Sequence, residues 1–230
     1  MPGDAREVFD AIAESWHSIR SRQKFLFPRW FRMFNATWKG GRVLDIGCGN
    51  CKNLVYLRGL EMHGMDFSKK MIKSGKRHND KKGFEIRYAV GDACSLPYKD
   101  GSFDHVLATA LYHHLEKDRQ NALLELFRIL RPGGEAFVTV WYRWKDRFLL
   151  RKRDITVPWT THGRTYSRYY HLFSFKEIRN LIREAGFGIV KEGSENGWKR
   201  TDRLFARNAC FLVRKPEFAT GDPGRIRSGA

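Results

Sequence analysis

Apolar side chains recur along this chain in two alternating patterns. Short apolar runs predict seven strands, within 42–50 and at 60–65, 84–90, 103–109, 136–141, 187–191 and 205–214. Apolar residues at helical spacing predict helices at 5–17, from Pro28 to Trp38, through Leu54 and Leu57, from Ser68 onward, at 118–130 and at 174–185. This alternation indicates an α/β fold, with a Rossmann-like, doubly wound, seven-stranded and mostly parallel sheet.

The alternation stops after Trp141. Residues 142–173 are basic and rich in tryptophan and tyrosine, and we interpret them as a substrate-binding insertion. The insertion belongs to one domain that spans residues 1–215. The last segment, 216–230, contains several glycines and a proline, and it is predicted to be disordered.

One predicted strand ends on an acid that opens into a glycine loop, Asp45-Ile46-Gly47-Cys48-Gly49. Glycines allow the backbone to turn tightly and to approach a ligand that a Cβ would obstruct. A dinucleotide-binding loop has a third glycine three positions further on, where this chain has Lys52. Asp66 follows the next strand, where it can accept hydrogen bonds from a ribose diol.

Polar residues follow several of the predicted strands. Asp45, Asp66, Asp92 and the stretch 110–114 all fall at carboxyl ends. In a doubly wound sheet, ligands bind at these ends, where the strand order reverses. We therefore expect these residues to converge on a single site.

The net charge of +18 over 230 residues is unevenly distributed. Residues 141–215 hold 18 basic and 7 acidic side chains, and therefore most of the excess. Clustered basic groups release counterions from phosphates, so the charge predicts a polyanionic partner. Simple solubility charge is the alternative.

Two sequence features bear on the compartment and on metals. No apolar run reaches the roughly 18–20 residues of a membrane helix, and residues 1–8 lack a signal-peptide core, so we expect a cytoplasmic protein without a membrane partner. Cys48 and Cys51 form a C-x-x-C pair, but the sequence has no second pair to complete a zinc site. We expect reduced thiols and no metal.

The glycine loop and its neighbours resemble motif I of the class I S-adenosylmethionine-dependent methyltransferases. The resemblance implies S-adenosylmethionine as cofactor, with the loop at Asp45, Gly47 and Gly49 facing its methionyl part and Asp66 holding the ribose. Arg20 is expected to pair with the methionyl carboxylate, unless it is a solvated surface arginine. The other expected cofactor contacts are Phe67, Met71, Asp92, Ala93 and Ala110.

Further motifs narrow the resemblance. Val157-Pro158-Trp159 and the run from Arg168 to Phe173 are similar to the tRNA wobble-uridine carboxymethyl methyltransferases. The stretches from Phe9 to Ala13 and from Leu111 to His114 are similar to the same family. These enzymes esterify the carboxylate of 5-carboxymethyluridine in the anticodon.

The chemistry of that reaction suits the residues present. A carboxylate is already anionic at neutral pH, so its methylation needs no base. It needs desolvation and orientation, which an arginine can provide. The resemblance suggests Arg168 for this clamp. The other expected residues are His113, His114 and Tyr169 in the catalytic pocket, and Trp159 and Tyr170 against an extruded base.

The resemblance also implies two partners. One is the tRNA anticodon loop. The other is a small zinc-binding activator protein that adds a strand to the sheet edge, for which 84–88 is the candidate strand. Two alternatives remain open: a methyltransferase of a quinone, sterol or carboxylic acid, and a non-catalytic RNA-binding subunit on the same fold.

Overall fold

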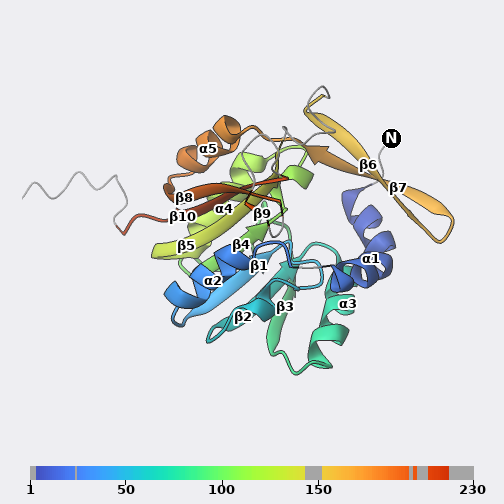
Figure 1. Cartoon of the computed structure of the whole chain (residues 1–230), viewed down its shortest axis with the longest axis horizontal. Helices are drawn as coiled ribbons and strands as arrows, with labels where there is room; N and C mark the ends of the chain where they lie inside the picture. Colours follow the sequence, from blue (N-terminus) through green and yellow to red (C-terminus); the bar gives the residue numbers. More distant parts are fainter. Residues whose placement is uncertain (1–3, 24, 143–151, 197–198, 201–206, 218–230) are drawn as a thin grey trace, which may run out of the picture.

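A twisted sheet forms the centre of the computed structural model, which describes residues 4–23, 25–142, 152–196, 199–200 and 207–217 (Figure 1). Its strand order is β3-β2-β1-β4-β5-β10-β8-β9. The strands are β1 (Arg42–Ile46), β2 (Glu61–Asp66), β3 (Ile86–Val90), β4 (Phe103–Thr109), β5 (Leu130–Trp141), β8 (Gly188–Asn196), β9 (Lys199–Arg200) and β10 (Asn208–Arg214). The predicted doubly wound sheet of seven strands is confirmed, and the two-residue β9 extends it.

Strand direction and order define a switch point. β1 to β5 pair in parallel, and β10 runs antiparallel between β5 and β8. The chain moves outward from β1 through β2 to β3, and it then returns to β4 on the other side of β1. The order therefore reverses between β1 and β4, and a crevice is expected at their carboxyl ends.

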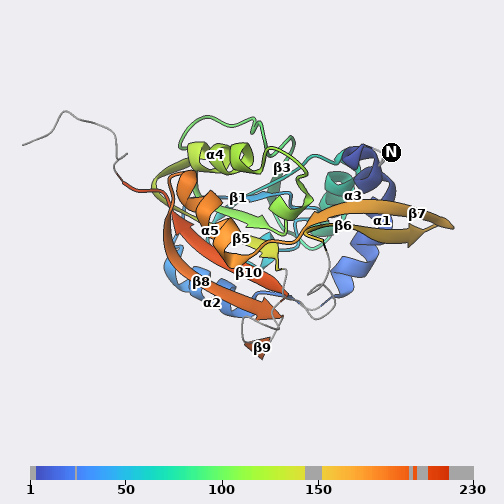
Figure 2. The same ribbon diagram turned by 90° about the horizontal axis from the view of Figure 1, so that it is seen from above.

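Alternate residues of the central strands point to opposite faces of the sheet. On one face, Val106 and Ala108 of β4 pack in a cluster with α4 (Arg119–Ile129) and α5 (Phe175–Glu184). On the other face, Leu107 packs in a cluster with α2 (Pro28–Thr37). Figure 2 shows helices on both sides of the sheet, as the doubly wound prediction requires.

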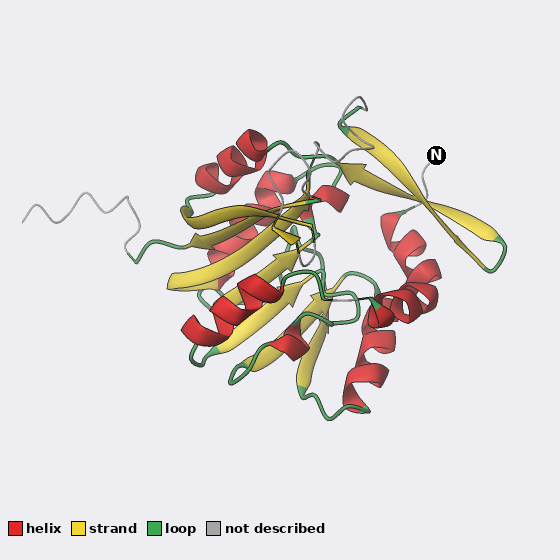
Figure 3. Ribbon diagram, in the orientation of Figure 1, coloured by secondary structure: helices red, strands yellow, loops and turns green. Residues whose placement is uncertain are grey.

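A third apolar cluster joins α1 (Ala5–Arg22), α3 (Lys69–Asp80) and a hairpin of β6 (Asp154–Thr161) and β7 (Arg164–His171). Ile12 and Met71 form its buried centre, and Trp159 packs against it. Figure 3 shows the hairpin as a separate twisted ribbon beside α1. The hairpin therefore reaches the rest of the molecule partly through the first helix.

Side-chain caps fix the starts of two helices. The Ser68 hydroxyl accepts the backbone N–H of Met71 at 3.1 Å, which confirms the predicted start of α3. Ser174 and Glu177 form a reciprocal capping box at the start of α5. Both caps satisfy backbone donors that a helix start otherwise leaves without partners.

The structure corrects three sequence expectations. The predicted helix through Leu54 and Leu57 is only a 3₁₀ turn, η1 (Leu54–Tyr56), because the segment before Gly59 is too short for an α-helix. The strand predicted at 136–141 begins earlier, because β5 follows α4 directly and includes residues 130–135. Much of the insertion at 142–173 is the hairpin, which the sequence pattern did not predict. The segment 143–151 and most of the expected tail lie outside the described residues.

Candidate active site

A pocket lies at the carboxyl ends of β1 and β4, where the strand order reverses. Most of the predicted site residues line it: Arg20, Gly47, Gly49, Asp66, Phe67, Met71, Asp92, Ala93, Ala110, His113, His114 and Tyr170. Asp45, Trp159, Arg168 and Tyr169 are not among the lining residues. The strand ends that carry Asp66, Asp92 and Ala110 thus meet at one pocket, whereas Asp45, which was expected with them, does not line it.

The glycine loop has the backbone shape that requires glycine. Gly47 and Gly49 have φ angles of +66° and +54°, and a Cβ on Gly47 would lie 2.9 Å from the Leu111 side chain. The Gly49 N–H donates to Oδ2 of Asp66 at 2.8 Å. The loop is thus fixed against the acid that follows the next strand.

Lys52, which stands in place of a third glycine, holds the loop to the end of α1. Its Nζ donates to the backbone oxygen of Arg20 at 2.8 Å and also to that of Gln23. A cation is favourable at carbonyl groups that end a helix. Lys52 therefore helps to place Arg20, which lines the same pocket.

Two buried acids lie at the glycine-loop end of the site, Asp66 in the pocket lining and Asp45 behind it. Burial raises the pKa of Asp45 to about 8 and that of Asp66 to about 6. Asp66 accepts the N–H groups of Gly49 and Ser68, whereas Oδ1 of Asp45 has no hydrogen-bond partner. Among the residues that the structure describes, neither acid forms an ion pair. A nearby positive charge would stabilise the ionised form of both acids, so this end of the site favours a positively charged ligand.

The turn after β4 is held in an uncommon conformation. Ala110 has a φ of +58°, which few residues other than glycine adopt. Its N–H donates to the backbone oxygen of Thr139 at 3.0 Å and to the Thr139 hydroxyl at 3.1 Å. The Thr109 hydroxyl accepts from the Asn53 side chain at 2.6 Å. Bonds from two neighbouring segments thus hold the chain where it enters the pocket.

His113 and His114 lie side by side in the 3₁₀ turn η2 (Tyr112–His114), with ring centroids 4.4 Å apart. Nδ1 of His113 accepts the N–H of Trp141 at 3.2 Å, and Nδ1 of His114 donates to the backbone oxygen of Tyr169 at 3.2 Å. Burial lowers the pKa of His113 well below its usual value and that of His114 to about 3. Both rings are therefore neutral at pH 7, and neither is a strong base.

Three arginines surround Tyr170 at the other end of the pocket. Arg20 and Arg207 line the pocket, and Arg168 donates to the Tyr170 hydroxyl at 2.8 Å. The Arg20 guanidinium lies 4.3 Å from the centre of the Trp16 ring. Burial and the nearby Arg207 and Arg168 lower the pKa of Arg20 to about 10, so it remains charged at pH 7. This end of the pocket suits an anion.

Arg168 and Trp159 lie behind this wall of the pocket. The Arg168 guanidinium is buried and lies 4.9 Å from the ring centre of Trp159 and 5.4 Å from that of Trp16. Trp159 Nε1 donates to the Ser15 hydroxyl at 2.9 Å, so this ring packs on α1. Arg168 reaches the pocket through Tyr170. The predicted clamp and base-stacking roles stay predictions.

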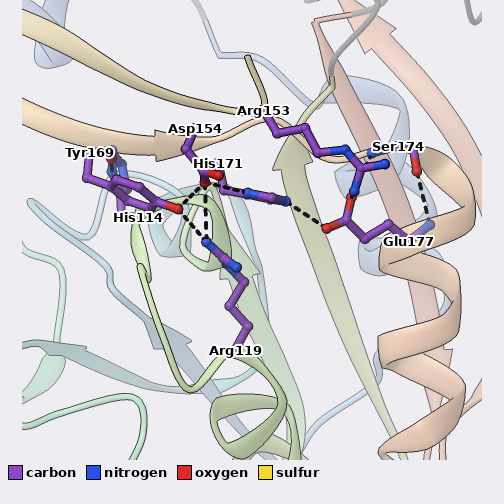
Figure 4. Close-up of polar contacts among 8 residues, drawn as sticks. All are labelled: His114, Arg119, Arg153, Asp154, Tyr169, His171, Ser174 and Glu177. Carbon is purple, nitrogen blue, oxygen red and sulfur yellow. Dashed lines mark hydrogen bonds and ion pairs between the residues drawn. The ribbon is translucent and has the colours of Figure 1, made fainter.

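A polar network connects the base of the hairpin to α4 and α5 (Figure 4). The two ring nitrogens of His171 contact Asp154 at 2.8 Å and Glu177 at 2.7 Å. The Tyr169 hydroxyl donates to Asp154, and Arg119 donates to that hydroxyl at 2.6 Å. The network therefore fixes the strand end that carries Tyr169.

Tyr169 acts on the pocket through its backbone. Its side chain lies in the network around Asp154, while its backbone oxygen accepts from His114. The hydrogen bond sets the tautomer of His114, because the nitrogen that donates must carry the proton. A catalytic role for the Tyr169 side chain stays a prediction.

Sequence reasoning missed Arg207 and Trp141 as pocket residues. The two lie at adjoining strand ends, since Trp141 pairs with Asn208. β10 is antiparallel, so the residue before it, rather than the one after it, falls at the pocket. A search confined to residues that follow strands cannot find Arg207.

Cys48, within the glycine loop, and Cys51, just after it, are buried free thiols. Burial raises the pKa of both, which makes them poor thiolates. In the described part of the chain, no group of three or more His, Cys, Asp and Glu side chains is placed to hold a metal ion. No helix in that part is long and apolar enough to cross a membrane.

The doubly wound sheet, with a glycine loop and buried acids at its switch point, defines a class I S-adenosylmethionine-dependent methyltransferase. A family model of the methyltransferase domain matches residues 44–138. The chain belongs to this family: it is 32% identical over 163 residues to a protein of Encephalitozoon cuniculi described as a methyltransferase, across 66% of this chain and 73% of that protein.

Other relatives share parts of the chain. It is 34% identical over 137 residues to the tRNA (carboxymethyluridine(34)-5-O)-methyltransferase of Mus musculus, which covers 59% of this chain but only 19% of that protein. Two solved structures share the fold. One is a Burkholderia thailandensis 1,6-didemethyltoxoflavin-N1-methyltransferase with S-adenosylhomocysteine. It has a TM-score of 0.68 and 18% identity, over 92% of this chain and 87% of that chain. The other is a Haloferax volcanii methyltransferase in complex with the Trm112 activator. It has a TM-score of 0.61 and 20% identity, over 93% of this chain and 98% of that chain.

S-adenosylmethionine is the cofactor of this family, and the pocket fits it. Its sulfonium and ammonium groups suit the end where Asp45 and Asp66 are buried without a cation among the described residues. Asp66 lies where the resemblance places the ribose. Arg20 supplies a charge for the methionyl carboxylate. The placement of each contact stays a prediction.

Proposed function

We propose that this protein transfers a methyl group from S-adenosylmethionine to the carboxylate of 5-carboxymethyluridine at the wobble position of tRNA. The observation that carries the proposal is the substrate end of the pocket. There, Arg207 lines the pocket together with His113 and His114, which are neutral and weakly basic. Such a site suits a nucleophile that is already anionic.

The pocket residues divide the work of this reaction. S-adenosylmethionine supplies an electrophilic methyl group when it is bound. Arg207 attracts and orients the substrate carboxylate, and Arg168 holds the Tyr170 hydroxyl beside it. No residue has to remove a proton, because the attacking oxygen carries the negative charge.

Aromatic rings supply the surface for the uracil. Tyr170 stacks on His113 at 5.1 Å with an angle of 15° between the ring planes, and Trp141 lies 4.4 Å from Tyr170. A base that leaves the anticodon stack requires an aromatic platform and exclusion of water. These three rings provide that platform in the proposed complex.

The relatives support an RNA substrate of this kind. Those named tRNA (carboxymethyluridine(34)-5-O)-methyltransferase include proteins of Mus musculus and Arabidopsis thaliana, at 34% and 35% identity. The chain spans only 19% and 31% of their lengths. The net charge of +18 suits a polyanionic substrate in the cytoplasm.

We further propose a small activator partner on β3. This strand lies at one edge of the sheet, and Val90 within it is 47% exposed. An edge strand offers backbone groups to an added strand. The Haloferax volcanii neighbour, which is a complex with the Trm112 activator, supports this arrangement.

Mass spectrometry of tRNA nucleosides from a deletion strain tests the substrate. We expect loss of the methyl ester with accumulation of free 5-carboxymethyluridine. An unchanged nucleoside profile would contradict the proposal. Purified protein and activator should also convert the accumulated acid in tRNA to the ester, whereas a small-molecule enzyme would leave it unchanged.

A further inference from the structure

The outer face of α3 concentrates positive charge away from the active site. Residues 69–82 contain seven lysine or arginine side chains and one acid, Asp80. Met71, Ile72 and Gly75 form the buried side of the helix. The basic side chains are exposed: Lys69, Lys70, Lys73, Lys76, Arg77, Lys81 and Lys82.

Most of these cations lack a neighbouring acid. Lys76 pairs with Asp80 at 2.6 Å, and Arg77 pairs with Glu14 at 3.3 Å. Between residues that the structure describes, no ion pair forms at Lys69, Lys70, Lys73, Lys81 or Lys82. The face therefore retains most of its charge for a partner.

The positive charge of this face affects the pKa of two nearby histidines. His17 and His78 lie with ring centroids 4.8 Å apart, between α1 and α3. Burial lowers the pKa of both, and the charge of Lys82 lowers both further. A bound polyanion would oppose this effect of charge.

Other surface helices show a different arrangement. On α4, Arg128 pairs with Glu125 at 2.7 Å and with Asp100 at 2.9 Å. On α5, Arg179 donates twice to Glu192, at 3.0 Å and 2.8 Å. Other helices also carry exposed cations, such as Arg32 and Lys176, but residues 69–82 concentrate them on one face.

The position of α3 relates this face to the pocket. Met71, in its first turn, lines the pocket, and Asp10 of α1 accepts from the Ser68 hydroxyl at 2.5 Å and from the Lys70 N–H at 3.2 Å. The 12 residues of the helix then extend for about 18 Å. Figure 1 shows α3 beside α1, running away from the hairpin.

We propose that the lysine face of α3 binds phosphates of the tRNA backbone, at nucleotides outside the one in the pocket. The inference rests on the proposed tRNA substrate. The length of α3 and the unpaired charges on its outer face suit a run of phosphates that continues past the modified base. A lysine ammonium group lacks the planar, bidentate geometry of an arginine guanidinium. It therefore suits a contact to a phosphate, which carries no sequence information.

Counterion release gives the proposal a measurable form. Each phosphate that a lysine neutralises contributes about 0.7–0.9 to the slope of log affinity against log salt. Replacing three lysines with glutamine should therefore lower this slope by about 2 to 3. Affinity for tRNA at 0.1 M salt should fall on the order of tenfold.

The test compares Lys69→Gln, Lys73→Gln, Lys81→Gln with a control triple on α2 and α5: Arg32→Gln, Lys176→Gln, Arg183→Gln. Both remove three exposed positive charges. The probe is tRNA that carries 5-carboxymethyluridine, purified from a deletion strain. Fluorescence anisotropy from 50 to 300 mM salt gives the slopes, and calorimetry checks that S-adenosylmethionine affinity is unchanged.

The expected result is a lower slope and a higher KM for tRNA in the α3 triple, with kcat unchanged and the control triple like the wild type. Equal slopes in both triples would overturn the α3 proposal while wild-type methylation of tRNA still supports the proposed function. If the wild type neither binds nor methylates this tRNA, the proposed function itself fails. If the α3 triple loses binding to phosphatidylserine vesicles but not to tRNA, a membrane surface replaces RNA as the partner.

Discussion

The two ends of the pocket are built in different ways. At the cofactor end, Gly49 and Asp66 come from consecutive strand ends and hydrogen bond directly. At the substrate end, His113, Tyr170 and Arg207 come from the turn after β4, the hairpin and the residue before the last strand. A local motif thus specifies the first end, whereas long-range packing assembles the second.

The two ends also differ in charge. Asp45 and Asp66 are buried without a cation in the described structure, and Arg20 and Arg168 are largely buried beside an aromatic wall. Burying a charge is costly unless a partner compensates for it. The arrangement suits a positively charged donor at one end and a negatively charged acceptor at the other. The proposed reaction needs this separation.

Removing Asp66 should have the largest effect, confined to the cofactor end. Asp66→Ala loses the expected ribose contacts and the acceptor for the Gly49 N–H. S-adenosylmethionine affinity should fall by about 3 kcal/mol, roughly 100-fold, in calorimetry. tRNA binding should stay within a factor of about two, as in a Glu184→Ala control at an exposed position of α5. Equal loss of both ligands would show that the two ends are not separate.

Removing Arg168 should act at the other end. Arg168→Ala leaves the Tyr170 hydroxyl without its donor and the aromatic wall without its buried cation. We expect turnover to fall by roughly 30-fold, with cofactor affinity almost unchanged. Arg164→Ala, at an exposed position of the same strand, is the control and should keep its turnover. Unchanged turnover in Arg168→Ala would remove this residue from the site.

The charge difference predicts a pH dependence of cofactor binding. The pKa values of about 6 for Asp66 and about 8 for Asp45 mean that protons compete with the cationic ligand. Affinity should therefore rise with pH, by roughly tenfold between pH 5 and 8. Calorimetry in buffers of different ionisation enthalpy should also detect proton release on binding. Asp45→Asn should flatten the upper part of the profile, and a flat wild-type profile would contradict the argument.

The same difference explains what the sequence predicted. The glycine loop, the acids and the cap at Ser68 depend on neighbours in the chain, so their patterns could be recognised. Arg207 and the hairpin depend on an antiparallel strand and on packing against α1, which no local periodicity encodes. The clamp role expected for Arg168 stays a prediction, and the structure adds that its guanidinium lies behind Tyr170.

The smallest effect should come from the network that holds the hairpin. Tyr169→Phe removes a hydroxyl that donates to Asp154 and accepts from Arg119, but it keeps the backbone oxygen that contacts His114. The loss should be about 1 kcal/mol, which lowers Tm by about 2–4 °C in a protein of this size. Turnover and cofactor affinity should change less than threefold, as a positioning role predicts.

Tyr166→Phe, on the same strand, is the control and should leave Tm unchanged. A large loss of turnover at normal Tm would instead place the Tyr169 hydroxyl in the reaction, and the substrate end would then extend beyond the pocket wall formed by Tyr170.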